Sequence, residues 1–287
     1  MSDLNANEWN SHWTKELQND NGYRAWEACH EAGKFLQYLD VLRERNARHI
    51  LLAGNGRALL PYALVHCGFE VTVVDFSSVV NESVAAVEPT AQQLALMLPV
   101  YEEVREGKML VGHWNHEASL SRVTEEAKEG GSLTFVTGDI LEWEPNTPID
   151  VIYDDRMAML FSDDARYALA QRYFRWVSES SLLVLHTVNL GRAIGRMHPG
   201  EQAQFEAVFA EFETAFIEAG FQPCELQRRE TRRIPAGPAP PSPVQRLVRW
   251  ISGRSQEPPI VTPLQEEPPI VTPLPEGKLV FFLHGSG

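Results

Sequence analysis

A strand, a glycine turn, a helix and a second strand follow one another between residues 49 and 75, and this order constrains the fold most strongly. Residues 49–53 form an apolar run that ends at glycines, residues 57–67 have helical character, and residues 70–75 are a valine-rich run. A strand–helix–strand unit of about thirty residues places its two strands parallel in one sheet. The chain is therefore predicted to build a parallel α/β sheet.

The same rhythm continues along the chain and predicts a Rossmann-like, seven-stranded, mostly parallel sheet with helices on both faces. The expected helices span 163–177 and 201–219, the latter ending at a glycine. The five further strands are expected at 133–137, 149–153, 181–188, 222–230 and 278–284.

The two ends of the chain depart from this rhythm. Residues 1–48 have helical periodicity and are expected to form an N-terminal helical lid, followed by the sheet domain at 49–232. Residues 233–277 are proline-rich, repeat one eight-residue motif, and contain a short amphipathic helix at 242–254. This stretch is interpreted as an insertion with capacity to bind a protein partner, after which residues 278–287 return as the final strand of the same sheet.

Composition excludes several functional classes. The chain has 287 residues and a formal net charge of −14, and an acidic surface repels phosphate backbones, so a nucleic-acid substrate is not expected. Its three cysteines form no CxxC pair, which argues against a disulfide framework or a structural zinc site. The sequence contains neither a signal-peptide pattern nor an apolar run long enough to cross a membrane, so a cytoplasmic location is expected.

The glycine turn is the strongest candidate for a binding site. Gly54, Asn55 and Gly56 follow the first strand, and glycine lets the backbone approach a nucleotide closely. Asp75 ends the second strand, where a carboxylate can accept hydrogen bonds from ribose hydroxyls, and Phe76 follows it. Two cofactors fit this arrangement: a dinucleotide such as NAD, or S-adenosylmethionine (SAM), which carries no phosphate.

Two nearby positions refine this choice. The NAD fingerprint requires a third glycine where this chain has Leu59, which favours SAM. Many SAM enzymes carry an acid two residues before the first glycine, and Leu52 stands there instead. After the third strand, Asp139 can accept from an adenine amine while Ile140 packs on the ring; the alternative for Asp139 is an Asx turn or helix cap.

The end of the fourth strand carries a resemblance to a known family. Asp155 and Arg156, an apolar stretch, and then Arg166 and Tyr167 at the start of a helix resemble the thiopurine S-methyltransferase family. Trp9 and Trp13, the segment 198–200 and the closing strand agree with it, whereas the glycine turn, the additional Asp154 and the segments 81–132 and 233–277 do not.

The resemblance implies a class I methyltransferase that uses SAM and a small-molecule methyl acceptor, with a thiol or a related sulfur, selenium or tellurium nucleophile favoured. Methyl transfer from a sulfonium is an in-line displacement that needs positioning and no metal. Arg156 would be the catalytic residue, beside the cofactor or an anionic acceptor; its alternative is a salt bridge to Asp154 or Asp155. Trp9 and Trp13 would cover the cofactor, or else pack a helix on the core.

Two other interpretations of the sequence remain open. A similar fold can serve an NAD(P)-dependent oxidoreductase, against which Leu59 argues. A non-catalytic Rossmann-like module can instead use its proline-rich insertion for a partner, and Leu52 gives this reading some weight. His113 and His116 make a weak metal-ligand pair, and His186 is interpreted as a core histidine near the expected site.

Overall fold

The computed structural model describes the larger part of the chain. The described residues are 6–18, 35–36, 38–106, 109–187, 210–226 and 274–284, and side chains within 101–113 are excluded from the description. Within these ranges the chain forms one seven-stranded sheet and a separate two-stranded hairpin. No helix among these residues has the length and apolarity required to cross a membrane.

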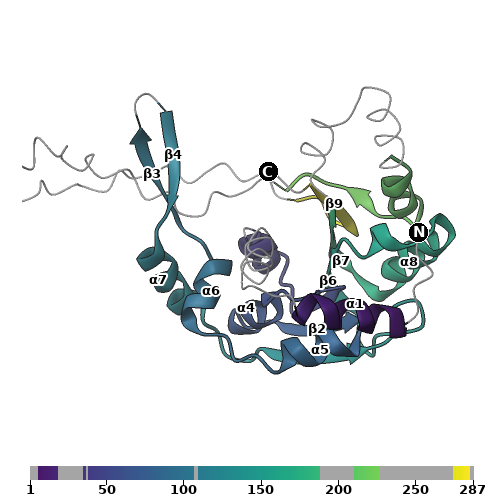
Figure 1. Cartoon of the computed structure of the whole chain (residues 1–287). Helices are drawn as coiled ribbons and strands as arrows, with labels where there is room; N and C mark the ends of the chain where they lie inside the picture. The colour runs from purple at the N-terminus through teal and green to yellow at the C-terminus, as the bar shows by residue number, and fades with distance from the viewer. Residues whose placement is uncertain are drawn as a thin grey trace, which may run out of the picture.

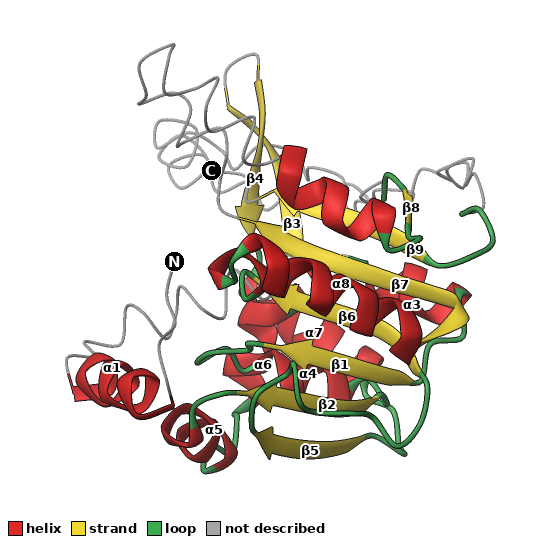
Figure 2. Cartoon of the chain, turned by 90° about the vertical axis from the view of Figure 1, so that its right-hand side faces the viewer, coloured by secondary structure: helices red, strands yellow, loops and turns green. Residues whose placement is uncertain are grey.

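Every pairing in the seven-stranded sheet is parallel, which confirms the expected Rossmann-like architecture. The spatial order is β5, β2, β1, β6, β7, β9, β8 (Figure 2). From β1 the chain first builds outward through β2 and β5, and then crosses to β6 on the opposite side of β1. The strands are β1 (His49–Ala53), β2 (Glu70–Asp75), β5 (Ser132–Thr137), β6 (Ile149–Asp155), β7 (Val177–Thr187), β8 (Gln222–Pro223) and β9 (Leu279–His284).

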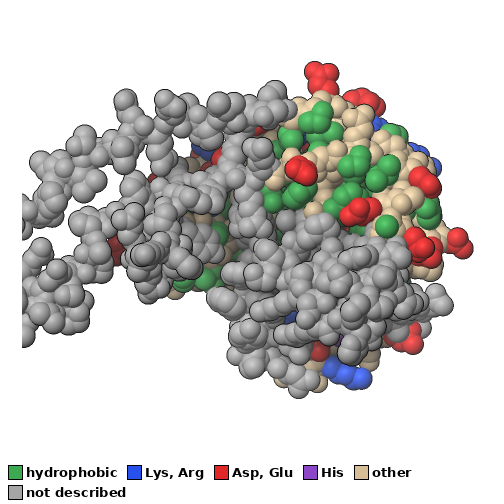
Figure 3. Space-filling view, turned by 90° about the horizontal axis from the view of Figure 1, so that it is seen from above, with side chains coloured by type: hydrophobic (Ala, Val, Ile, Leu, Met, Phe, Trp, Pro, Cys, Tyr) green, Lys and Arg blue, Asp and Glu red, His purple; other side chains and the backbone are tan. Residues whose placement is uncertain are grey.

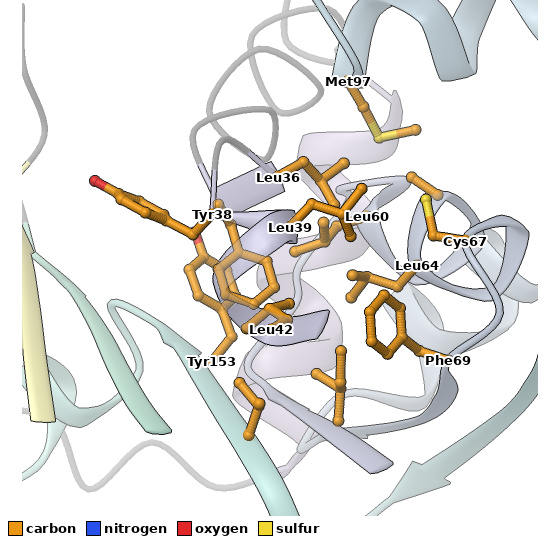
Figure 4. Close-up of a cluster of buried hydrophobic side chains, with 14 of the residues drawn as sticks. Leu36, Tyr38, Leu39, Leu42, Leu60, Leu64, Cys67, Phe69, Met97 and Tyr153 are labelled. Carbon is orange, nitrogen blue, oxygen red and sulfur yellow. The ribbon is translucent and has the colours of Figure 1, made fainter. Parts of the chain in front are cut away.

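Helices cover both faces of the sheet, as the near-continuous apolar runs of β1 and β2 require. One face packs on α3 (Leu39–Glu44), α4 (Leu60–His66) and α6 (Ala91–Met97), with side chains converging from α3, α4 and β6 (Figure 4). The other face packs on α8 (Asp163–Trp176) and the helical residues 210–218. Alternate strand residues therefore enter different cores.

Element boundaries differ from the predictions by more than two residues in three places. α4 begins at Leu60 and not at residue 57, because residues 55–59 form the glycine turn and Pro61 lies in the first helical turn. β7 begins at Val177, directly after α8. The strand predicted at 222–230 is wrong beyond Pro223, where β8 ends. Residues 224–226 are not in a strand, and Pro223 has no N–H to continue the ladder of hydrogen bonds. Residues 227–230 lie outside the description.

A segment between β2 and β5 was not predicted in detail. It contains α5 (Ser78–Ala85), α6, and α7 (His116–Glu126), with a hairpin between the last two. Strands β3 (Tyr101–Glu106) and β4 (Met109–Trp114) pair antiparallel and project away from the sheet (Figure 1). Ser119 of α7 fixes the base of this hairpin, since its hydroxyl accepts hydrogen bonds from the Trp114 indole at 2.8 Å and from the Val100 amide at 2.9 Å.

The expected N-terminal lid is described in two parts. α1 (Ala6–Gln18) is one, and residues 35–36 and 38–44, which include α3, are the other, whereas 19–34 lie outside the description. Most of the proline-rich stretch 233–277, its expected helix at 242–254 included, also lies outside it, so the proposed domain boundaries at 232 and 277 stay predictions. Figure 3 shows acidic side chains scattered among apolar ones over the described part of one surface.

Candidate functional site

The order of the strands places the topological switch point of the sheet between β1 and β6. In open parallel α/β sheets, ligands bind outside the carboxyl ends of the strands, at the point where the strand order reverses. Ala53 of β1 pairs with Asp154 of β6, so the glycine turn after β1 lies beside the end of β6. The sequence-predicted residues of both segments are thereby brought to the same edge.

The glycine turn requires both of its glycines. Gly54 and Gly56 have φ values of +68° and +56°, in the left-handed region that side chains disfavour. A Cβ on Gly54 would also lie 2.7 Å from Cβ of Met157, at the turn after β6. Asn55 is buried and its side-chain amide donates to the Ala58 carbonyl at 2.9 Å, which fixes the path toward α4. The turn is therefore closely packed against the turn that follows β6.

Asp75 lies beside this turn, at the end of β2. Its Oδ1 accepts a hydrogen bond from the Ser77 amide at 2.9 Å, and the Gly56 and Phe76 amides also face its carboxylate. Burial raises the pKa of Asp75 to about 6, although these amides counteract the rise. Phe76 is half-buried in the following loop. The geometry joins Gly56, Asp75 and Phe76 in one cluster.

Helix α1 packs over the same cluster. The Ser77 hydroxyl donates to the Asn10 side chain at 2.7 Å, which ties α1 to the end of β2. The ring of Trp13 would come within 3.4 Å of a Cβ built on Gly56, so Trp13 lies directly over the glycine turn. Trp9 is half-buried and its ring contacts the His12 ring edge-on at 5.6 Å. Trp13 is thus placed at the site, whereas the Trp9 ring contacts His12 within α1.

Asp154 and Asp155 at the end of β6 point to opposite faces, as alternation along a strand requires. Asp154 is fully buried on the α8 face, where it accepts from the Tyr173 hydroxyl at 2.9 Å and from the Ala158 amide at 3.0 Å. Burial raises the pKa of Asp154 to about 7. Sequence reasoning missed this role, although a carboxylate in a buried strand signals a buried partner.

Asp155 lies on the other face, in contact with two basic side chains. Its Oδ1 accepts from His186 Nδ1 at 2.8 Å and from Arg156 Nε at 3.1 Å. Burial raises the pKa of Asp155, but the His186 hydrogen bond and the Arg156 charge outweigh it and hold the pKa below its ordinary value. The sequence left open a salt bridge from Arg156 to either Asp154 or Asp155. The structure shows the salt bridge to Asp155.

Arg156 has an unusual backbone. Its φ is +66°, uncommon for a residue with a side chain, and its amide donates to the His186 carbonyl at 3.1 Å. Its side chain is 48% exposed. His186 is buried at the end of β7, and Nδ1 also lies 3.3 Å from the Tyr153 hydroxyl. The expectation of a core histidine adjoining the site agrees with this placement.

The turn after β5 holds Asp139 and Ile140. The Gly138 amide donates to the Asp75 carbonyl at 3.0 Å, so this turn adjoins the cluster at β2. Asp139 Oδ1 accepts from the Leu141 amide at 2.8 Å, which is the Asx turn foreseen as the alternative. Ile140 is buried in the core under α8. Contacts of both residues with an adenine stay a prediction.

Other sequence signals have structural roles in the described residues. Arg166 is buried and donates to the carbonyls of Ala158 and Phe161, so it shapes the loop after β6, whereas Tyr167 is exposed. The expected segment 198–200 lies outside the description. No group of three or more potential metal ligands occurs among the described residues. A cavity of about 250 Å³ lined by His49, Thr72 and Trp143 contains none of the predicted site residues.

Comparisons with known proteins give similarity in structure alone. No protein-family model matches the chain, and no curated protein matches it. The structure resembles the magnesium protoporphyrin IX methyltransferase of Synechocystis PCC 6803 with bound SAH, S-adenosylhomocysteine (14% identity, 76% of this chain and 88% of that one, TM-score 0.43). It also resembles the plantazolicin methyltransferase BpumL in complex with a pentazolic analogue and SAH (11%, 85% and 69%, TM-score 0.40).

A third structure concerns the conversion of a disulfide bond into a thioacetal group during echinomycin biosynthesis (18% identity, 49% of this chain, TM-score 0.29). The chain spans about half the length of that protein, 46%. The identities and TM-scores of all three are low, and the function of this chain is inferred from its own sheet order and site geometry.

Proposed function

We propose that the protein is a SAM-dependent methyltransferase that acts on a small-molecule nucleophile. The observation that carries this proposal is the cluster at the carboxyl ends of β1 and β2, where a left-handed glycine turn, the Asp75 carboxylate and the Trp13 ring lie together. A carboxylate suits a ribose diol, and an aromatic face attracts a sulfonium cation. These three features match the three chemically distinct parts of SAM better than those of other nucleotides.

The same turn is poorly suited to a dinucleotide. A pyrophosphate docks on the N-terminus of a helix that follows the glycines directly. Here α4 begins at Leu60, four residues after Gly56, and has seven residues. Leu59, in the place of the third glycine, is buried in the core on that face. This geometry favours a cofactor without phosphate over NAD, so the oxidoreductase alternative is the weaker one.

Each predicted residue has a role in this proposal. Gly54, Asn55 and Gly56 would give backbone access to the methionine part of SAM, and Asp75 with Phe76 would hold the ribose. Asp139 and Ile140, in the turn after β5, would border the adenine. Trp13, and Trp9 one turn earlier on α1, would cover the cofactor. Asp155 would contact the methionine end from β6.

Catalysis in this proposal is a matter of positioning. SAM supplies an activated methyl group on a sulfonium, so no metal or strong base is required for a soft acceptor. Arg156, exposed at the end of β6, would hold an anionic or polarisable acceptor in line with that methyl group. A thiol, or a related selenium or tellurium nucleophile, is the acceptor class we favour, from the resemblance of residues 155–167 to the thiopurine S-methyltransferases.

Titration calorimetry with SAM, SAH and NADH tests the proposal. We expect micromolar binding of SAM and SAH and no heat with NADH. Asp75→Asn, which keeps the shape of the side chain, should weaken both bound ligands. Absence of SAM and SAH binding by a folded protein would overturn the proposal and favour a non-catalytic module.

The proline-rich stretch is proposed to be peripheral to this chemistry and to bind a protein partner, in a cytoplasmic protein. Deleting residues 235–275 should then leave the affinity for SAH unchanged. Weaker SAH binding by this variant would show that the insertion forms part of the site and would contradict the peripheral role.

A further inference from the structure

The position before the glycine turn leaves one part of the proposed cofactor without a partner. The methionine end of SAM carries an α-ammonium, which needs an anionic or carbonyl acceptor in a site sheltered from water. Leu52 occupies the place where many SAM enzymes carry an acid, and its side chain is fully buried in the core beside α4. Strand β1 therefore supplies no carboxylate for the ammonium.

Strand β6 supplies an acid on the same face, one strand away. Leu52 pairs with Tyr153, and both side chains enter the core formed with α3 and α4. Asp155 lies two residues after Tyr153 and, because side chains alternate, points to the same face. It lies about 6.6 Å further along the strand direction, at the rise of about 3.3 Å per residue, and thus at the edge beside Gly54.

The contacts of Asp155 prepare it to bind a cation. His186 Nδ1 and Arg156 Nε both donate to Oδ1, which orients the carboxylate without using Oδ2. The two basic neighbours hold the pKa of Asp155 below its ordinary value, so the group is ionised at neutral pH. Its side chain is 14% exposed, which shelters an ion pair from screening by water.

The other carboxylates at this edge are committed elsewhere. Asp154 is buried on the opposite face, where it binds Tyr173 and the Ala158 amide. Asp75 is assigned to the ribose and receives backbone amides from its own loop. Asp139 caps its own turn through the Leu141 amide. Among the described acids near the glycine turn, Asp155 alone combines the correct face with an oxygen outside these contacts.

We propose that Asp155 binds the α-ammonium of SAM through Oδ2, in place of an acid on β1, and that His186 is the residue that positions it. This inference rests on the proposed function and deepens it. The site would have moved its ammonium-binding acid from the strand that carries the glycine turn to the neighbouring strand. His186 acts through Asp155 and makes no contact with the cofactor in this scheme.

Calorimetry with two related ligands tests the proposal without any methyl acceptor. SAH contains the α-ammonium, whereas methylthioadenosine has the same adenosine and thioether but lacks the amino-acid group. Asp155→Asn should lower the affinity for SAH by about tenfold or more, as expected for the loss of a charge-assisted hydrogen bond, and leave that for methylthioadenosine within about twofold. Asp164→Asn, an exposed acid on α8, is the matched control and should change neither.

The possible results distinguish a failure of the methyltransferase proposal from a failure of the assignment of Asp155. If the unaltered protein binds neither ligand, the proposed function fails. If it binds both and Asp155→Asn weakens SAH and methylthioadenosine equally, or weakens neither, the assignment of Asp155 is wrong while the methyltransferase proposal stands. Thermal unfolding confirms that each variant is folded before titration.

His186 is tested by the pH dependence of binding. His186→Gln removes the imidazole that helps keep Asp155 ionised, so the pKa of Asp155 should rise. As the solution is acidified, the variant should then lose its affinity for SAH at a higher pH than the unaltered protein does. Binding of methylthioadenosine should show no such difference between the two proteins. Identical SAH profiles for the two proteins would refute the positioning role.

Discussion

Tyr173→Phe removes a single oxygen from the core and should reveal the charge state of Asp154. The Tyr173 hydroxyl donates to Asp154 Oδ2 at 2.9 Å, and both side chains are buried, so phenylalanine leaves no cavity but removes one donor. A hydrogen bond to an ionised group contributes about 1.5–3 kcal/mol, and one between neutral groups about 0.5–1.5 kcal/mol. The cost of the substitution should therefore depend on pH.

The sign follows from the raised pKa of Asp154, about 7 against an ordinary value of 3.8. Between these values the folded protein retains a proton that the unfolded chain releases, so this group contributes stability at low pH that is lost as pH rises through about 7. Tyr173→Phe raises the pKa further, because the hydroxyl stabilises the ionised form. The substitution should cost about 1 kcal/mol at pH 5 and about 2–3 kcal/mol at pH 8.5.

Urea denaturation at the two pH values measures both costs from the change in midpoint at constant slope. Tyr167→Phe is the control, since Tyr167 is exposed on the same helix and should change stability by less than about 0.5 kcal/mol at either pH. An equal loss at pH 5 and pH 8.5 for Tyr173→Phe would refute the reasoning that a buried carboxylate at this position becomes ionised.

Three further predictions concern the proposed site. Gly54→Ala should destabilise the fold by about 1–2 kcal/mol or more, because φ is +68° and the new Cβ would collide with Met157. In the control Gly138→Ala the new Cβ enters open space, and the free energy of unfolding should change by less than about 0.5 kcal/mol. Equal losses for the two variants in urea denaturation would contradict this prediction. SAH affinity should be constant above pH 7 and fall as pH drops through about 6, because ribose hydroxyls donate to the ionised Asp75 carboxylate and protonation removes that acceptor. Asp75→Asn should abolish this pH dependence. A flat profile in the unaltered protein would argue against Asp75 as the ribose acceptor. Trp13→Ala should weaken SAM more than SAH by about two- to fivefold, since only SAM carries the sulfonium charge that an aromatic face attracts; equal losses in calorimetry would assign Trp13 to packing alone.

The sequence predicts the central strands well because their signals are local. β1 and β2 occur at the residues expected, since a short apolar run bounded by glycine or by Asp75 has few alternatives in a parallel sheet. The β3–β4 hairpin was not predicted, because its two strands pair antiparallel in a separate two-stranded sheet, outside the alternation of parallel strands and helices. β8 was predicted too long, because periodicity does not show which residues find a neighbouring strand.

The site could be predicted as a set of positions but not as a network. Gly54, Gly56 and Asp75 follow strand ends, and parallel strands bring their carboxyl ends to one edge, so their proximity follows from sequence. The different roles of Asp154 and Asp155 do not follow from sequence. They depend on which face of the sheet each carboxylate enters and on partners 19 and 31 residues away, Tyr173 and His186. Only the assembled sheet determines those partners.

The position of β9 has a consequence for how the chain acquires its structure during synthesis. β9 is the last strand described, yet it lies between β7 and β8 and pairs with β7 over six residues. Until β9 emerges from the ribosome, β7 presents an open, apolar edge of the kind that recruits other chains into aggregates. A nascent chain that stops short of β9 is therefore expected to depend on chaperones, and closure of this edge is a late, long-range step in folding.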